Sequence, residues 1–192
     1  MFFNADVRAD EKMSKPATQP AAAASDDMMA KMMELGTPGP QHQLLEKMAG
    51  HFTVKSAFRM SPDSPWQEST GEEKGEMILG GRYLKADFNG DMMGKPFKGV
   101  GLTGYDNYAK KFNSVWVDSM STMMMVSEGT ASADGKTLTF GSECDCPITG
   151  EKKQMRQVWT ITDDDHHGFV MYDKTPDGKE FESLKIEYTR VK

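Results

Sequence analysis

The sequence has few of the residues that staple a fold or hold a metal ion. Only two cysteines occur among 192 residues, and they stand one residue apart, as Cys144-Asp145-Cys146. This spacing is too short for ordinary disulfide geometry, and nothing at zinc-finger spacing completes a four-ligand site. We expect ordinary thiols at a strand end or turn, and we predict neither a metal site nor a cofactor.

Positive charge and long apolar runs are also scarce. The formal net charge is -6 and no run of Lys and Arg stands out, so the sequence does not predict nucleic-acid binding. No window approaches the roughly 18 apolar residues that span a bilayer. Asp6, Arg8 and Asp10 lie where a signal peptide would be apolar, which predicts a cytoplasmic protein. A periplasmic or secreted location stays open, because an exported domain can also begin with a leader and an Ala/Pro tether.

Common catalytic templates are missing as well. The chain has no Gly-x-Ser-x-Gly, no P-loop, no His-Glu-x-x-His and no dinucleotide fingerprint after a strand. An enzyme is therefore not the first hypothesis.

Composition divides the chain into three parts. Residues 1–25 are predicted to be a disordered leader and linker, because their second half is rich in Pro, Ala and Ser. Residues 26–49 are predicted to form two short helices, the first Met-rich over 26–35 and ending at Gly36, the second beginning near Pro40 and ending at Gly50. Residues 50–192 have strand character.

Ten runs of alternating polar and apolar residues, rich in Thr, Val and aromatics, predict β-strands. They cover residues 51–60, 68–79, 82–90, 95–106, 112–120, 122–132, 136–144, 152–162, 167–175 and 179–191. Short hairpin-like links favour an antiparallel up-and-down meander, and closure into a barrel protects its edges. The predicted fold class is thus all-β, an antiparallel barrel of about ten strands.

Three stretches carry a family resemblance. They read GYDNYAKKFNSVWVDSMST from Gly104, DGKTLTFGSECDCPITGEKKQMRQVWTI from Asp134, and MYDKTPDGKEFESLKIEYTR from Met171. Together they resemble the bacterial domain-of-unknown-function family 1579 over roughly residues 46–192. The resemblance implies a calycin-like barrel, related to lipocalins, fatty-acid-binding proteins and nitrobindin-like heme proteins. The family usually has Asp-Pro where this chain has Cys146-Pro147.

Two further features are similar to lipocalin-like chains. Such chains open with Gly-x-Trp and close with an Arg that packs over the Trp. Here Gly50-His51-Phe52 opens the barrel and Arg190 closes it. Since Phe52 replaces the Trp, the expected contact becomes a guanidinium over a Phe ring.

A ligand-binding group is predicted from inward-facing polar and aromatic side chains. Trp116 and Asp118 share a strand face with Phe112. An inward Asp needs a partner, and Arg156 or Arg82 is expected to lie within reach. Tyr83, Tyr105, Tyr172, Tyr188 and Arg190 complete the candidates. The alternative is that Trp116 is a core anchor and Asp118 a strand-end residue bonded to backbone or solvent.

The histidines and methionines could bind metal ions, but a structural role is favoured for both. The sequence DDDHH at residues 163–167 could bind a divalent cation, but a solvated hairpin tip is favoured. Heme is disfavoured because no His lies in the middle of a strand. Methionine occurs 17 times, and Met28, Met29, Met32 and Met33 could hold Cu(I), but an adaptable apolar helix face is favoured.

Three functional hypotheses follow. The first is a barrel that binds a small apolar or amphipathic molecule. The second is an enzyme that uses the same cavity on a hydrophobic substrate, with Asp118 or a Tyr as acid or base. The third is a filled barrel whose Met-rich helix, residues 26–35, recruits a partner protein.

Overall fold

The computed structural model describes residues 20–145 and 150–192, with side chains from residue 25 onward. Two compact units divide at Gly36, and the second spans Thr37–Lys192. No helix within these ranges is long and apolar enough to cross a membrane. Residues 1–19 of the predicted leader, and Cys146 with the Pro that follows it, lie outside the described residues.

Helix α1 spans Pro20–Leu35 and begins earlier than predicted. The predicted linker contains four consecutive alanines, and alanine has the highest helix propensity of all residues. The Met-rich face exists, since Met28, Met29, Met32 and Met33 keep between 57% and 68% of their surface exposed. Its docking role stays a prediction.

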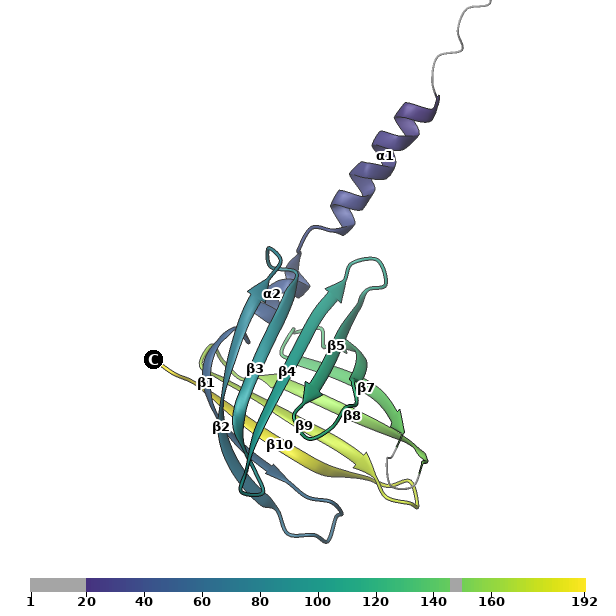
Figure 1. Ribbon diagram of the computed structural model, residues 1–192. Helices are drawn as coiled ribbons and strands as arrows, with labels where there is room; N and C mark the ends of the chain where they lie inside the picture. The colour runs from purple at the N-terminus through teal and green to yellow at the C-terminus, as the bar shows by residue number, and fades with distance from the viewer. Residues whose placement is uncertain (1–19, 146–149) are drawn as a thin grey trace, which may run out of the picture. The chain divides into compact units, whose positions relative to one another are not determined.

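Ten antiparallel strands form a closed barrel, as predicted. They are β1 (Gly50–Phe58), β2 (Gln67–Ile78), β3 (Tyr83–Met92), β4 (Lys95–Asp106), β5 (Lys111–Asp118), β6 (Met125–Ala131), β7 (Thr137–Asp145), β8 (Lys152–Ile161), β9 (His166–Lys174) and β10 (Glu180–Arg190). Each pairs with the next along the chain, and β10 returns to pair with β1 (Figure 1). The ten described strands therefore leave no strand edge for pairing with another chain.

One end of the barrel is closed by helix α2, Pro40–Glu46, which belongs to the barrel unit rather than to a separate pair of helices (Figure 1). Leu45 and the following Met48 are 0% and 4% exposed. They pack into one buried cluster with inward side chains of the strands, among them Leu84, Phe112 and Leu138. The helix therefore provides an apolar plug for this end.

Arg190 fastens the same end. Its guanidinium donates to the carbonyls of Lys47, Ala49 and Asp164 at 2.9, 2.8 and 2.7 Å. It also lies 4.5 Å from the centre of the Phe52 ring, so the contact that the lipocalin likeness implied is present. Gly50 permits this approach, because its φ is +139° and a Cβ there would stand 2.0 Å from the guanidinium.

Replacing Arg190 by Met is expected to lower the free energy of unfolding by about 2–4 kcal/mol, because three bonds from a charged group to backbone carbonyls are lost together. Urea unfolding of the purified variant measures this. Arg82→Met is the control, since Arg82 is exposed and donates to one carbonyl, that of Leu79. Equal stability of the two variants would contradict the role assigned to Arg190.

Candidate functional site in the barrel interior

Alternation along the strands defines an inner face. Phe112 is 1% exposed and lies in the core cluster, so Ser114, Trp116 and Asp118, at the following alternate positions of β5, also point inward. The face shared by Trp116 and Asp118 is thus the interior of the barrel.

Burial along the inner face differs between the two halves of the barrel. Near α2, inner side chains such as Leu138 and Phe140 are 0% and 2% exposed. Away from α2, several large inner side chains keep partial exposure, namely Phe88, Trp116, Met125, Met155, Met171 and Leu184. In a closed barrel, an inward side chain can be exposed to solvent only through the barrel interior or an open end of the barrel. We call this half, lined by those six residues, the open half.

Glu73 is the most unusual inner residue. It lies on β2 between its register partners Phe52 and Phe88, and only 4% of its surface is exposed. Within the described part of the chain its carboxyl has no hydrogen bond or ion pair. Burial, and then the charge of Asp87, raises the pKa of Glu73 from 4.5 to about 7. A carboxyl perturbed in this way is typical of functional sites.

An aromatic cluster adjoins Glu73. The rings of Tyr188 and His167 stack at 4.2 Å, and Trp159 stacks on Tyr188 at 5.6 Å. Phe52 meets the His167 ring edge-on at 4.6 Å. Burial, and then the negative charge of Glu73, raises the pKa of Tyr188. The phenol therefore keeps its proton.

His167 is neutral within this cluster. It is 5% exposed, and burial, followed by the charge of Arg190, lowers its pKa from 6.5 to about 4. Its Nε2 is occluded and lacks a partner in the described residues. The prediction that both histidines of DDDHH lie in a solvated tip is therefore wrong for His167, which is the second residue of β9. It holds for His166, which is exposed and bonds Asp163 at 2.8 Å.

Heme was disfavoured because no histidine was predicted in the middle of a strand, but His167 of β9 does point into the barrel. The Nε2 of His167 is, however, covered by side chains, and so does not present an open ligand position. In the described ranges no group of three or more His, Cys, Asp or Glu is arranged to hold a metal ion.

The open half also carries a neutral polar group. The amide of Gln157, 5% exposed, donates to the hydroxyls of Ser127 and Ser142, both at 3.1 Å. Thr103 and Ser114 form a second hydroxyl pair at 2.9 Å. These bonds satisfy the polar side chains that they join, whereas the carboxyl of Glu73 and the Nε2 of His167 have no partner among the described residues.

Trp116 and Asp118 contact each other rather than an arginine. The indole Nε1 donates to Asp118 at 3.3 Å, and the other carboxylate oxygen accepts from the backbone N–H groups of Met120 and Ser121 at 2.9 and 3.0 Å. The indole lies against Gly99, where a Cβ would stand 2.1 Å from it. Asp118 thus caps the end of β5, which is the alternative interpretation considered above.

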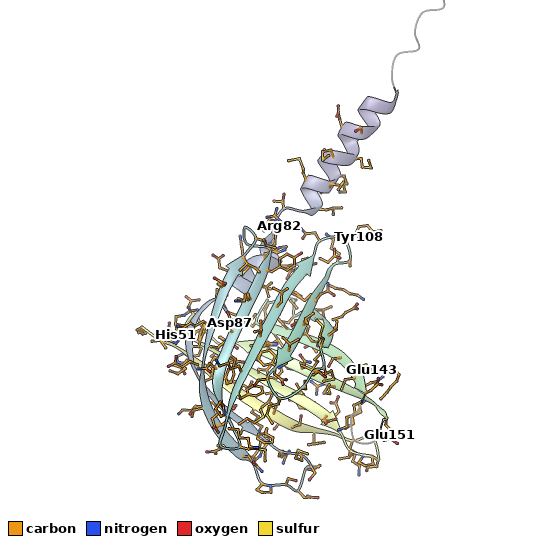
Figure 2. The ribbon with its side chains drawn as sticks, viewed as in Figure 1. His51, Arg82, Asp87, Tyr108, Glu143 and Glu151 are labelled. Atoms are coloured by element: carbon orange, nitrogen blue, oxygen red, sulfur yellow. The ribbon has the colours of Figure 1, made fainter. Side chains whose placement is uncertain are left out.

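The expected pairing of Asp118 with Arg156 or Arg82 does not occur. Arg156 bonds Glu180 at 2.8 Å and lies 3.8 Å from the Tyr172 ring. It is on the outer face, because its neighbour Gln157 points inward. Arg82 is exposed in the turn before β3, at the end of the barrel where α2 lies (Figure 2).

The remaining candidates divide between the two faces. Tyr83 is 39% exposed and packs on Gly104 outside the barrel. Tyr105 points inward, with its ring 4.9 Å from Phe112, and Tyr188 belongs to the aromatic cluster. Arg190 acts at the closed end. Of the predicted candidates, four therefore point into the interior at different levels of the barrel, namely Trp116, Asp118, Tyr105 and Tyr188. The interior also holds Glu73, His167, Trp159 and Gln157, which the sequence did not single out.

Two grooves of ligand size lie on the outside. One, of about 550 Å³, lies beside α2 and is lined by Gln43, Lys47, Asp165 and Arg190 among others. The other, of about 570 Å³, lies over β6–β8 and includes Glu143, Arg156 and Glu180. Both are open to solvent. The first is lined by polar and charged residues, the second also by Val126, Phe140 and Met155, and neither includes Glu73.

Comparison with known proteins agrees with this architecture. The structure of Rv2717c from M. tuberculosis matches with a TM-score of 0.60 and 16% identity, covering 81% of this chain and all of that one. The S-type phycobiliprotein lyase CPES from Guillardia theta matches with a TM-score of 0.57 and 12% identity, covering 78% and 92% of the two chains. At these identities the likeness shows the fold alone.

The family is shown by a different comparison. No curated protein matches the chain. A family model does match, over residues 37–190, which are α2 and the whole barrel. The chain therefore belongs to DUF1579, the family described as a protein of unknown function.

Proposed function

We propose that the barrel binds a small apolar or amphipathic molecule in its open half. The observation that carries the proposal is the exposure of large inner side chains, among them Phe88, Trp116 and Met171, in a barrel whose other half is packed. An apolar space with a few polar groups is the usual composition of a small-molecule site. The structural likeness to a phycobiliprotein lyase, whose barrel has a similar fold, supports this proposal.

Filling the open half is expected to abolish binding. Gly101 lies on the inner face, and a Cβ there would make ordinary contacts of 3.5 Å with Trp116 and 3.7 Å with Ala86. Gly101→Leu therefore extends a side chain into the interior without a backbone clash. We expect at least about a tenfold loss of affinity for the neutral apolar dye Nile red, measured by its fluorescence.

Gly141→Leu is the matched control, because Gly141 is an outer-face strand glycine with nothing within 4 Å of its Cβ position. It is expected to bind the dye like the parent. If the parent does not bind the dye, or if both leucine variants bind it unchanged, the interior is not the binding site.

A catalytic role is the second candidate, and the Glu73–Tyr188 pair favours it. The carboxyl has a pKa near 7 and lies close enough to affect the phenol. A carboxyl that titrates near neutrality is suited to general acid–base work. Turnover of a bound hydrophobic substrate that Glu73→Gln abolishes, with binding retained, would distinguish this function from binding alone.

A further inference from the structure

In the part of the chain that the structure describes, the middle of the barrel contains the Glu73 carboxyl and no positively charged side chain. Among the described residues at inner-face positions of the strands, positive side chains occur only near the barrel ends. Lys95 is exposed at the β3–β4 turn, Lys153 is paired with Asp173 at 3.3 Å, and Arg190 is bonded to carbonyls beside α2. A ligand carboxylate would find no free positive partner near Glu73.

The groups that face or influence Glu73 are neutral or negative. On β3, Phe88 is the register partner of Glu73. Asp87 adds negative charge from the outer face of β3, where it is paired with Lys85 at 2.6 Å. On β1 the partner is Phe52, which separates Glu73 from the Arg190 guanidinium stacked on that ring. Tyr188 on β10 keeps its proton, and His167 on β9 is neutral above about pH 4. Asp118 on β5 is held by Trp116 and two backbone N–H groups.

Burying a carboxylate without a partner costs free energy, and a bound cation would supply that partner. Partly exposed aromatic rings stand on the same inner face, Phe88 directly beside Glu73 and Trp159 next to Tyr188. Aromatic faces attract organic cations, most strongly when these are desolvated. The interior thus offers a charged acceptor surrounded by surfaces that tolerate a cation and its hydrocarbon.

We infer that the ligand of the barrel is an amphipathic molecule with a basic nitrogen, whose protonated N–H donates to Glu73 while its apolar part packs against Phe88 in the open half. This inference rests on the proposed function and names its ligand class. It excludes fatty acids as the preferred ligands, because their carboxylate would be placed beside the carboxyl of Glu73.

Three matched probes test the inference: 1-naphthylmethylamine, 1-naphthylmethanol and 1-naphthoic acid. They share one ring system and differ in charge. Isothermal titration calorimetry of the full chain at about pH 8, where Glu73 is ionised, is expected to give the amine about tenfold tighter binding than the alcohol, the gain of one charge-assisted hydrogen bond. The acid is expected to bind most weakly.

Lowering the pH to about 5.5 should weaken amine binding about tenfold or more, because Glu73 must then lose a proton, whereas alcohol binding should change little. Glu73→Gln is expected to remove both the preference for the amine and its pH dependence. Glu72→Gln, which removes an exposed carboxyl from the outer face of the same strand, should retain them.

The outcomes separate this inference from the proposed function. If the alcohol binds and the amine shows no advantage, or the acid binds best, the basic-nitrogen inference is overturned while the proposed function stands. If no probe binds and Nile red does not bind either, the proposed function itself fails.

Discussion

Glu73→Gln is expected to stabilise the protein by about 3 kcal/mol at about pH 8. Near pH 4.5 it should hardly change the stability, because the folded parent then holds a protonated, neutral Glu73 where the variant has a neutral Gln. The pKa of Glu73 is about 7 in the fold and 4.5 without burial, so the folded state holds a proton that the unfolded state has lost between these values. Glu73 therefore does not reduce the free energy of unfolding below pH 4.5, and it reduces that free energy progressively as the pH rises through about 7.

Urea unfolding across this pH range measures the effect as the difference between the variant and the parent, which cancels the titration of other groups. Glu72→Gln serves as the control, because the Glu72 side chain is 61% exposed and its difference from the parent should stay small and nearly flat. A Glu73→Gln difference as flat as that of the control would mean that Glu73 is hydrated or paired.

His167→Phe is expected to protect the barrel against acid. The pKa of His167 is about 4 in the fold against 6.5 without burial, so unfolding takes up a proton between these values. The parent should lose about 3 kcal/mol from this group as the pH falls from about 6.5 to about 4. Phe keeps the ring that stacks on Tyr188 and removes the unpartnered Nε2, so the variant should be no less stable at neutral pH.

The neighbouring histidine provides the control. His166→Asn changes an exposed ring bonded to Asp163, and it should leave the acid limb of the stability profile almost as in the parent. Thermal unfolding at several pH values distinguishes the two variants. An unchanged acid limb in His167→Phe would show that His167 can be protonated without opening the barrel.

Period-two alternation and turn residues were sufficient to predict the ten strands, their antiparallel order and the closure. Alternation is a local property of the chain, and a hairpin needs only neighbouring residues. The early start of α1 was missed because a Pro- and Ala-rich segment was interpreted as a tether, although its alanines favour a helix.

The site was harder to predict. Each residue must be assigned to the inner or the outer face of its strand before its side-chain partners can be inferred. In β8, Gln157 and Trp159 point inward, which places Arg156 outside with Glu180. The same rule applied to β2 puts Glu73 on the face of Gly71 and Met77. Its burial was hidden by a run of charged neighbours, and its lack of a partner depends on the registers that place Phe52 of β1 and Phe88 of β3 on either side of it.

The likeness to lipocalin-like chains was informative where it concerned single contacts. Arg190 stacks on Phe52 at 4.5 Å, although the ring is not an indole. A contact between a cation and an aromatic face tolerates this exchange. The family itself says nothing of what the interior holds, so the ligand class has to come from Glu73 and the rings around it.

The titration of Glu73 tests the central claim most directly. Carboxyl ¹³C NMR of the protein labelled at glutamate, with Glu73→Gln to assign the resonance, reports the ionisation of this group alone. The account predicts a midpoint near pH 7 in the free protein and a fall of at least about one unit when 1-naphthylmethylamine is bound. A midpoint near 4.5 in the free protein would contradict the account, because it would show that the carboxyl is already solvated or paired inside the barrel.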